Sequence, residues 1–76
     1  MKKYIGYWTA GTTSNTTARE SENITAMRRD MKSIARANCY RGDAAGYSIT
    51  WQDGDVQHVE EGVFRAGRWI VENYTL

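Results

Sequence analysis

The spacing of His58 and Glu60 is the pattern in this chain that comes closest to acid–base chemistry. If this segment forms a strand, alternation places both side chains on one face, where a carboxylate can orient a general base. Such a pair also needs a nucleophile or a metal beside it, and the neighbouring sequence offers neither. We therefore interpret His58, the only histidine, as a structural cross-strand residue, and we predict that the protein is not an enzyme.

Cys39, the only cysteine, is the second candidate for chemistry. As a nucleophile it would need a base that only His58 could supply, so we interpret it as a small buried apolar group. One cysteine and one histidine cannot form an internal disulfide or a metal ligand set. The seven glycines are spread along the chain rather than gathered into a phosphate-binding loop. The sequence therefore predicts no metal and no other cofactor.

Charge is the more informative pattern. Residues 19–41 contain six basic and three acidic residues, whereas residues 43–64 contain five acidic residues and no lysine or arginine. A separation of this kind acts on binding partners rather than on the fold. Since Asp53 and Asp55 are expected in a turn, the acidic counter-patch is predicted at Glu60 and Glu61. The residues predicted to bind a protein partner are Arg28, Arg29, Lys32, Arg36, Glu60 and Glu61.

Binding of nucleic acid is an alternative for the same basic residues. They could follow phosphates from a helix surface while aromatic side chains of the sheet stack on bases. The net charge of only +1 argues against this alternative, and a solvated helix face without a binding role also remains open. The residues of the nucleic-acid alternative are Arg28, Arg29, Lys32, Arg36, Arg41, Tyr7, Trp8 and Trp69.

The first half of the chain must position these residues on a strand and a helix. Residues 3–10 alternate like a strand, residues 11–15 form a polar turn, and residues 16–20 either return as a short strand or form a loop. Ser21 is the expected N-cap of a helix, with Glu22 in the first turn. A stop is expected at residues 38–42, where Gly42 can take the left-handed conformation. The apolar stripe of the helix is Ile24, Met27, Met31, Ile34 and Ala35.

The second half reads as three antiparallel strands. Residues 45–51 alternate, and Asp53-Gly54 predicts a two-residue type I′ turn that places Trp51 opposite Val56. The same register places Ile49 opposite His58 and Tyr47 opposite Glu60. Because a glutamate fits poorly beside a core, we expect a bulge around residues 61–62. A second turn at residues 66–67 leads into the last strand.

These elements predict one α+β domain spanning residues 1–76. A single helix packs on one face of a four- to five-stranded antiparallel sheet, in the order β(β)αβββ. The other face of the sheet stays open, and two copies could associate through it. No apolar run acts as a signal peptide or spans a membrane, so the expected location is cytoplasmic and no membrane partner is expected.

The layout resembles that of small phage-encoded anti-CRISPR proteins. The resemblance lies in a helix that runs into the joint Ile34-Ala35-Arg36-Ala37-Asn38-Cys39-Tyr40-Arg41-Gly42, then an Asp-Gly hairpin and a late Gly67-Arg68-Trp69. Among these proteins the chain looks most like a compact type I inhibitor that packs one helix on an antiparallel sheet.

This resemblance implies a non-enzymatic phage inhibitor that evades host defence. It would dock on a Cas subunit of a type I surveillance complex in the cytoplasm of an infected bacterium, and block target DNA by steric and electrostatic occlusion. Inhibitors of this kind use basic side chains to occupy the nucleic-acid path or acidic ones to contact Cas lysines. Which sign is used here stays open, and direct contact with nucleic acid remains an alternative.

Overall fold

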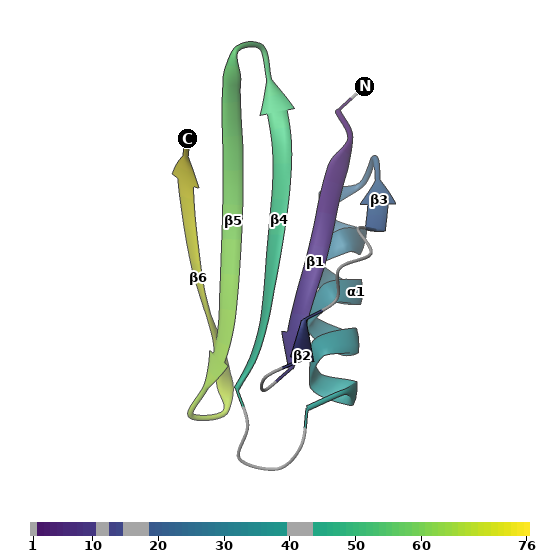
Figure 1. The fold of residues 1–76 in the computed structure, drawn as a ribbon, viewed down its shortest axis with the longest axis vertical. Helices are drawn as coiled ribbons and strands as arrows, with labels where there is room; N and C mark the ends of the chain where they lie inside the picture. The colour runs from purple at the N-terminus through teal and green to yellow at the C-terminus, as the bar shows by residue number, and fades with distance from the viewer. Residues whose placement is uncertain (1, 11–12, 15–18, 40–43) are drawn as a thin grey trace.

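A single helix and an antiparallel sheet make up this computed structural model, which describes residues 2–10, 13–14, 19–39 and 44–76. The predicted α+β fold is confirmed (Figure 1). The elements are β1 (Tyr4–Ala10), β2 (Thr13–Ser14), β3 (Arg19–Ser21), α1 (Ile24–Ala37), β4 (Ala45–Asp53), β5 (Val56–Arg65) and β6 (Arg68–Thr75).

The sheet is antiparallel throughout and has the order β2-β1-β4-β5-β6, with β3 also paired to β1. β2 pairs with the end of β1 and β3 with its beginning, so the two short segments share the place of one outer strand. The short strand expected at residues 16–20 is present in part. Arg19 and Glu20 belong to β3, and residues 16–18 lie outside the described residues.

α1 covers one half of one sheet face, where it packs on β1, β4 and β3 (Figure 1). Its predicted apolar stripe is confirmed, since Met27, Met31 and Ala35 are buried. Met27 and Met31 form the centre of the core with Tyr47 and Ile49 of β4. Packed around this centre are Tyr4, Trp8, Ile34, Trp51 and Trp69. β5 and β6 lie outside the area that α1 covers, and side chains of the described residues link them to the helix.

The helix begins two residues later than the sequence suggested. Asn23, not Ser21, is the N-cap, and its side-chain oxygen accepts from the Ala26 N–H at 3.1 Å. Ser21 ends β3, where its Oγ accepts from the Asn23 N–H at 3.0 Å. The prediction was wrong because asparagine caps as well as serine does, and pairing with β1 holds Ser21 in a strand. Glu22 therefore precedes the first turn. The helix ends at Ala37 with Asn38 as its C-cap, and Gly42 lies outside the described residues.

The register of the β4–β5 hairpin also differs from the prediction. Asp53 pairs with Val56, so the loop is Gly54-Asp55 rather than Asp53-Gly54. Gly54 alone has a positive φ, of 62°, at the first loop position, as a type II′ turn requires. Trp51 therefore lies opposite His58 rather than Val56. A shift of this kind leaves every side chain on its predicted face, because the pairs move by two residues.

The remaining predicted partners of β4 change in the same way. Ile49 lies opposite Glu60 rather than His58, and Tyr47 lies opposite Gly62 rather than Glu60. Packing accounts for the observed register. It stacks the Trp51 and His58 rings at 5.2 Å with an interplanar angle of 8°, and it places a residue without a side chain beneath the Tyr47 ring.

Replacing Ala66 with asparagine should stabilise the β5–β6 hairpin. Ala66 and Gly67 form its two-residue loop with φ values of 51° and 78°, the positive pair that a type I′ turn needs. Alanine is strained in this conformation, whereas asparagine tolerates it, so the free energy of unfolding should rise by about 0.5–1 kcal/mol. Denaturant unfolding measures the change. Ala66→Val should lower the free energy of unfolding, and a gain for valine would contradict the turn assignment.

Candidate partner-binding surface

Glu60 is a buried carboxylate beneath the edge of the helix. Alternation along β5 turns its side chain to the face that carries α1, and only 1% of its surface is exposed. Burying a carboxylate is strongly unfavourable unless charged or hydrogen-bonding partners surround it. The burial of the Glu60 carboxylate therefore requires partner side chains from other elements of the fold.

Arg28 of α1 and Tyr47 of β4 supply those partners. Arg28 donates from Nε to both carboxylate oxygens, at 3.0 and 2.9 Å, and from Nη2 to Oε1 at 2.7 Å. The Tyr47 hydroxyl donates to Oε2 at 2.8 Å. A guanidinium that donates to both oxygens orients the carboxylate and also compensates its negative charge. This network joins the helix to β5, and the sequence did not assign Tyr47 to it.

The predicted bulge around residues 61–62 is wrong. β5 pairs without interruption to β4 on one side and to β6 on the other. The poor fit of a glutamate at this place is resolved by Arg28, not by a kink in the strand. Gly62 has a different role, since it lies directly opposite Tyr47 and leaves room for the ring whose hydroxyl reaches Glu60.

Stability should fall on acidification because of Glu60. Burial raises the pKa of its carboxyl group, but the hydrogen bonds from Arg28 and Tyr47 outweigh burial and hold the pKa below its ordinary value of 4.5. A folded-state pKa below the unfolded one stabilises the protein above the unfolded value. This contribution is lost as the pH falls below 4.5 and through the folded-state pKa.

Thermal unfolding followed from pH 7 to pH 3 measures this loss. Glu60→Gln is the control, because it removes the titrating group while retaining an oxygen that can accept from Tyr47. The control should therefore lose less stability than the natural protein over this interval. Equal slopes would show that Glu60 does not stabilise the folded state through its charge.

Three basic residues lie in a row along the border between α1 and β5–β6. We call Arg28, Lys32 and Arg36, spaced four residues apart, the basic stripe. The Lys32 Nζ lies 5.9 Å from the centre of the Trp69 ring, and the Arg36 guanidinium lies 3.9 Å from the centre of the Phe64 ring. Aromatic faces attract cations, so the two rings hold these charges in place. Phe64 was not recognised as part of this surface from the sequence.

Lys32 and Arg36 are the charges of the stripe that are available to a partner. Arg28 is bound to Glu60, while in the described parts of the chain no carboxylate lies within 4.0 Å of the Lys32 or Arg36 nitrogens. Arg29 points elsewhere and lies 3.5 Å from Asp30. Arg41 lies outside the described residues. The structure thus separates the five predicted basic residues into a stripe of three, one exposed arginine and one residue that it does not describe.

The predicted acidic counter-patch of Glu60 and Glu61 does not form a common surface. Glu60 is buried under the helix side of the sheet, and the next residue in the strand points to the opposite face. There Glu61 accepts a hydrogen bond from the Tyr74 hydroxyl. This part of the prediction was wrong because the basic and acidic segments meet inside the molecule, through Arg28 and Glu60.

The aromatic residues of the nucleic-acid alternative are also divided. Tyr7 is exposed on the open sheet face, since the preceding residue, Gly6, faces the methionines of the helix. Trp8 is half-buried against the core. Only Trp69 lies beside the basic stripe, where it contacts Lys32.

His58 and Cys39 do not come together. His58 stacks on Trp51 near the loop end of β4 and lies 3.9 Å from an oxygen of Asp53. Cys39 is half-buried and contacts the Ala44 carbonyl oxygen at 3.5 Å, just before the other end of β4. Among the residues that the structure describes, no group of three or more His, Cys, Asp or Glu side chains is placed to hold a metal ion.

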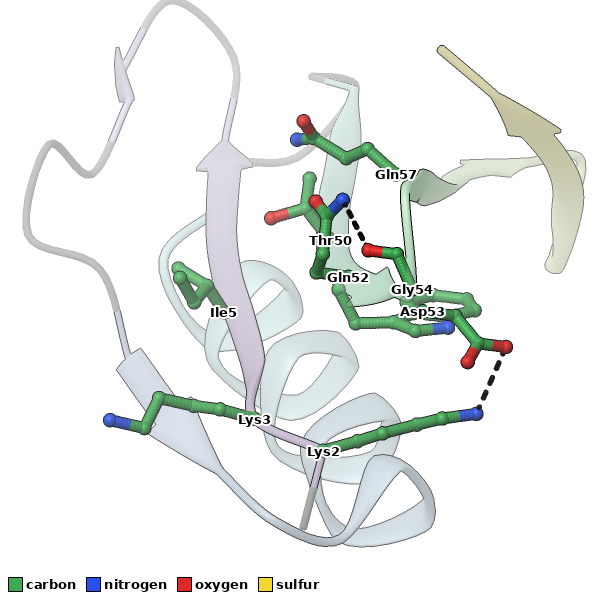
Figure 2. A pocket seen from close by; sticks show the side chains of 9 residues that line it. Lys2, Lys3, Ile5, Thr50, Gln52, Asp53, Gly54 and Gln57 are labelled. Atoms are coloured by element: carbon green, nitrogen blue, oxygen red, sulfur yellow. Dashed lines mark hydrogen bonds and ion pairs between the residues drawn. The ribbon is translucent and has the colours of Figure 1, made fainter.

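An open hollow of about 550 Å³ lies beside the tip of the β4–β5 hairpin (Figure 2). Two lysines border it, but Lys2 lies 3.4 Å from Asp53, whereas Lys3 points away from it and lies 3.6 Å from Glu20. Gln52 donates to the Gly54 carbonyl oxygen at 3.1 Å. Both lysines at this hollow are thus paired with carboxylates, and we place the candidate surface at the basic stripe instead.

Comparison of the chain with models of known protein families, with curated proteins and with solved structures finds no match to any of them. Within the described part of the chain, no helix has both the length and the apolar character that crossing a membrane requires.

Proposed function

We propose that the protein is a non-enzymatic phage inhibitor that binds a Cas subunit of a type I CRISPR surveillance complex and prevents target DNA from binding. The basic stripe is the observation that carries the proposal. Lys32 and Arg36 present two charges on one helix face, fixed over aromatic rings, beside a half-buried Trp69. Arginine and aromatic residues are enriched where proteins bind one another.

A surface rich in acidic side chains is the proposed target of the stripe. Charges held in position before binding lose little freedom when a partner arrives, and complementary charge speeds association and selects the partner. Once docked, the sheet and the β4–β5 hairpin would block the space beside the contact. The proposed place of action is the cytoplasm of an infected bacterium, where such complexes operate.

Target-DNA binding by a purified type I complex tests the proposal. With the protein in excess, the apparent affinity for target DNA should fall by at least about tenfold, a difference of roughly 1.4 kcal/mol. The protein alone should not bind the same DNA. If no type I complex loses affinity for its target, the inhibitory function is wrong.

A nucleic-acid-binding module is the second candidate. It is favoured by the contacts of Lys32 with Trp69 and of Arg36 with Phe64, because single-strand binders combine cations with aromatic rings. Two features oppose it: both cations lie over the ring faces that bases would need, and Tyr7 lies on the other sheet face. Direct binding of labelled DNA or RNA that weakens steeply with salt would favour this module over the inhibitor.

A further inference from the structure

β6 is a long strand at the edge of the sheet. Among the described strands it pairs with β5 alone, and the Leu76 N–H donates to the Gln57 carbonyl oxygen at 2.9 Å. Because hydrogen bonding alternates along an antiparallel pair, the backbone groups of Trp69, Val71 and Asn73 point away from β5. No strand among the described residues covers them. Natural edges are commonly protected by proline, charged side chains, a bulge or short length; β6 has eight residues, no proline and no bulge, and its charged residues are Arg68 and Glu72.

Apolar side chains lie along this edge on both faces of the sheet. Ile70 is 44% exposed on the open face, and Val71 is 41% exposed on the face that carries the helix. A second strand placed beside β6 would cover both at once. The edge therefore offers apolar surface as well as backbone groups.

The charges of β5 and β6 on the open face are unfavourably arranged within one molecule. Glu61 lies directly opposite Glu72, and Arg65 lies directly opposite Arg68. Like charges in such positions destabilise a strand pair. The pair Val63 and Ile70 lies between them and forms, with three of these charged residues, a hollow of about 180 Å³.

We propose that two copies of the protein join edge to edge through β6, antiparallel and with the two-fold axis at Ile70. Arg68 then lies opposite the partner's Glu72, and Ile70 lies opposite the partner's Ile70. The outward backbone groups of Trp69 bond those of the partner's Val71, and the two side chains pack together. The arginine pair of one copy, Arg65 and Arg68, then lies beside the glutamate pair of the partner, and the two sheets join into one continuous sheet.

Charge selects this register over its neighbours. Moving the axis to Val71 places Ile70 opposite the partner's Glu72 and leaves Arg68 without an acidic residue opposite. Moving it to Glu72 places two glutamates opposite each other. Only the register centred on Ile70 pairs charges of opposite sign and apolar residues with apolar residues.

Charge reversal tests the dimer independently of the proposed function. Light scattering of the natural protein should give the mass of a dimer. Arg68→Glu should raise the dimer dissociation constant at least tenfold, yet keep the fold, because it creates an attractive pair with Arg65. The double variant Arg68→Glu, Glu72→Arg should restore the dimer. A monomer at every concentration would overturn the proposal and would leave the edge open to a strand of another protein. A dimer whose dissociation constant is unchanged by Arg68→Glu would overturn it as well.

Cross-linking tests the register. Ile70 lies at a non-hydrogen-bonded pair in the proposed dimer, where Cα atoms are about 4.5 Å apart and a disulfide can form. In a Cys39→Ser background, Ile70→Cys should form a disulfide-linked dimer under mild oxidation, and Glu72→Cys should not. Cross-linking of the Glu72 variant alone would overturn the register.

Discussion

Replacing Arg28 with methionine is expected to lower the free energy of unfolding at pH 7 by about 3 kcal/mol, the lower end of the cost of removing one partner from a buried ion pair. Methionine retains most of the apolar stem but leaves the carboxylate of Glu60, 1% exposed, with Tyr47 as its remaining hydrogen-bond donor. The lower end applies because the Arg28 side chain is itself 40% exposed. Denaturant unfolding followed by tryptophan fluorescence measures the change.

Arg29→Met is the matched control, because it makes the same chemical change one residue further along the helix. The Arg29 side chain is 76% exposed and has only a surface contact with Asp30, so its replacement should stay within about 0.5 kcal/mol. The deficit of the Arg28 variant should also shrink at low pH, where Glu60 becomes neutral. Equal effects of the two substitutions would show that the buried pair does not stabilise the fold.

Replacing Gly62 with alanine should also be strongly destabilising, by about 2–3 kcal/mol. A Cβ atom at this position would lie 2.1 Å from Cε2 of the Tyr47 ring. The ring cannot move aside freely, because its hydroxyl is bonded to Glu60 and it packs against Trp69 at 5.5 Å between ring centres. Relief of the clash therefore disturbs the same network that holds Glu60. Thermal and denaturant unfolding of the variant measure the loss.

Gly6→Ala is the control for this prediction. Its Cβ atom would lie 2.6 Å from Sδ of Met27, which is also too close. Methionine side chains are flexible and can adjust to a small change of shape, so the cost should be smaller than at Gly62. A larger loss for Gly6→Ala than for Gly62→Ala would contradict the view that the anchored tyrosine ring defines the tighter contact.

Periodicity was sufficient to predict the fold class from the sequence. The methionine stripe predicted the buried side of α1, and alternation around Tyr47 and Ile49 predicted which face of β4 meets it. Local signals at element ends were less informative. Both Ser21 and Asn23 can cap a helix, and Asp53, Gly54 and Asp55 allow two different hairpin loops, so pairing and packing between strands decided in each case.

The candidate surface was only partly predictable for a related reason. Helical spacing identified Arg28, Lys32 and Arg36 as neighbours, but it could not show that one of them turns inward to a carboxylate from another element. A glutamate in phase with buried positions of β5 was the available signal. We took this signal to mean that the strand has a bulge. A buried carboxylate with an arginine partner explains the same pattern without interrupting the strand.

Charge reversal in the basic stripe should weaken the inhibition of target-DNA binding by a type I complex. We expect Lys32→Glu combined with Arg36→Glu to need at least about tenfold more protein for the same inhibition, with the fold retained by circular dichroism. Arg19→Glu combined with Arg29→Glu makes the same change in net charge outside the stripe and should inhibit like the natural protein. Equal loss in both double variants, or no loss in the stripe variant, would show that the basic stripe does not bind the partner.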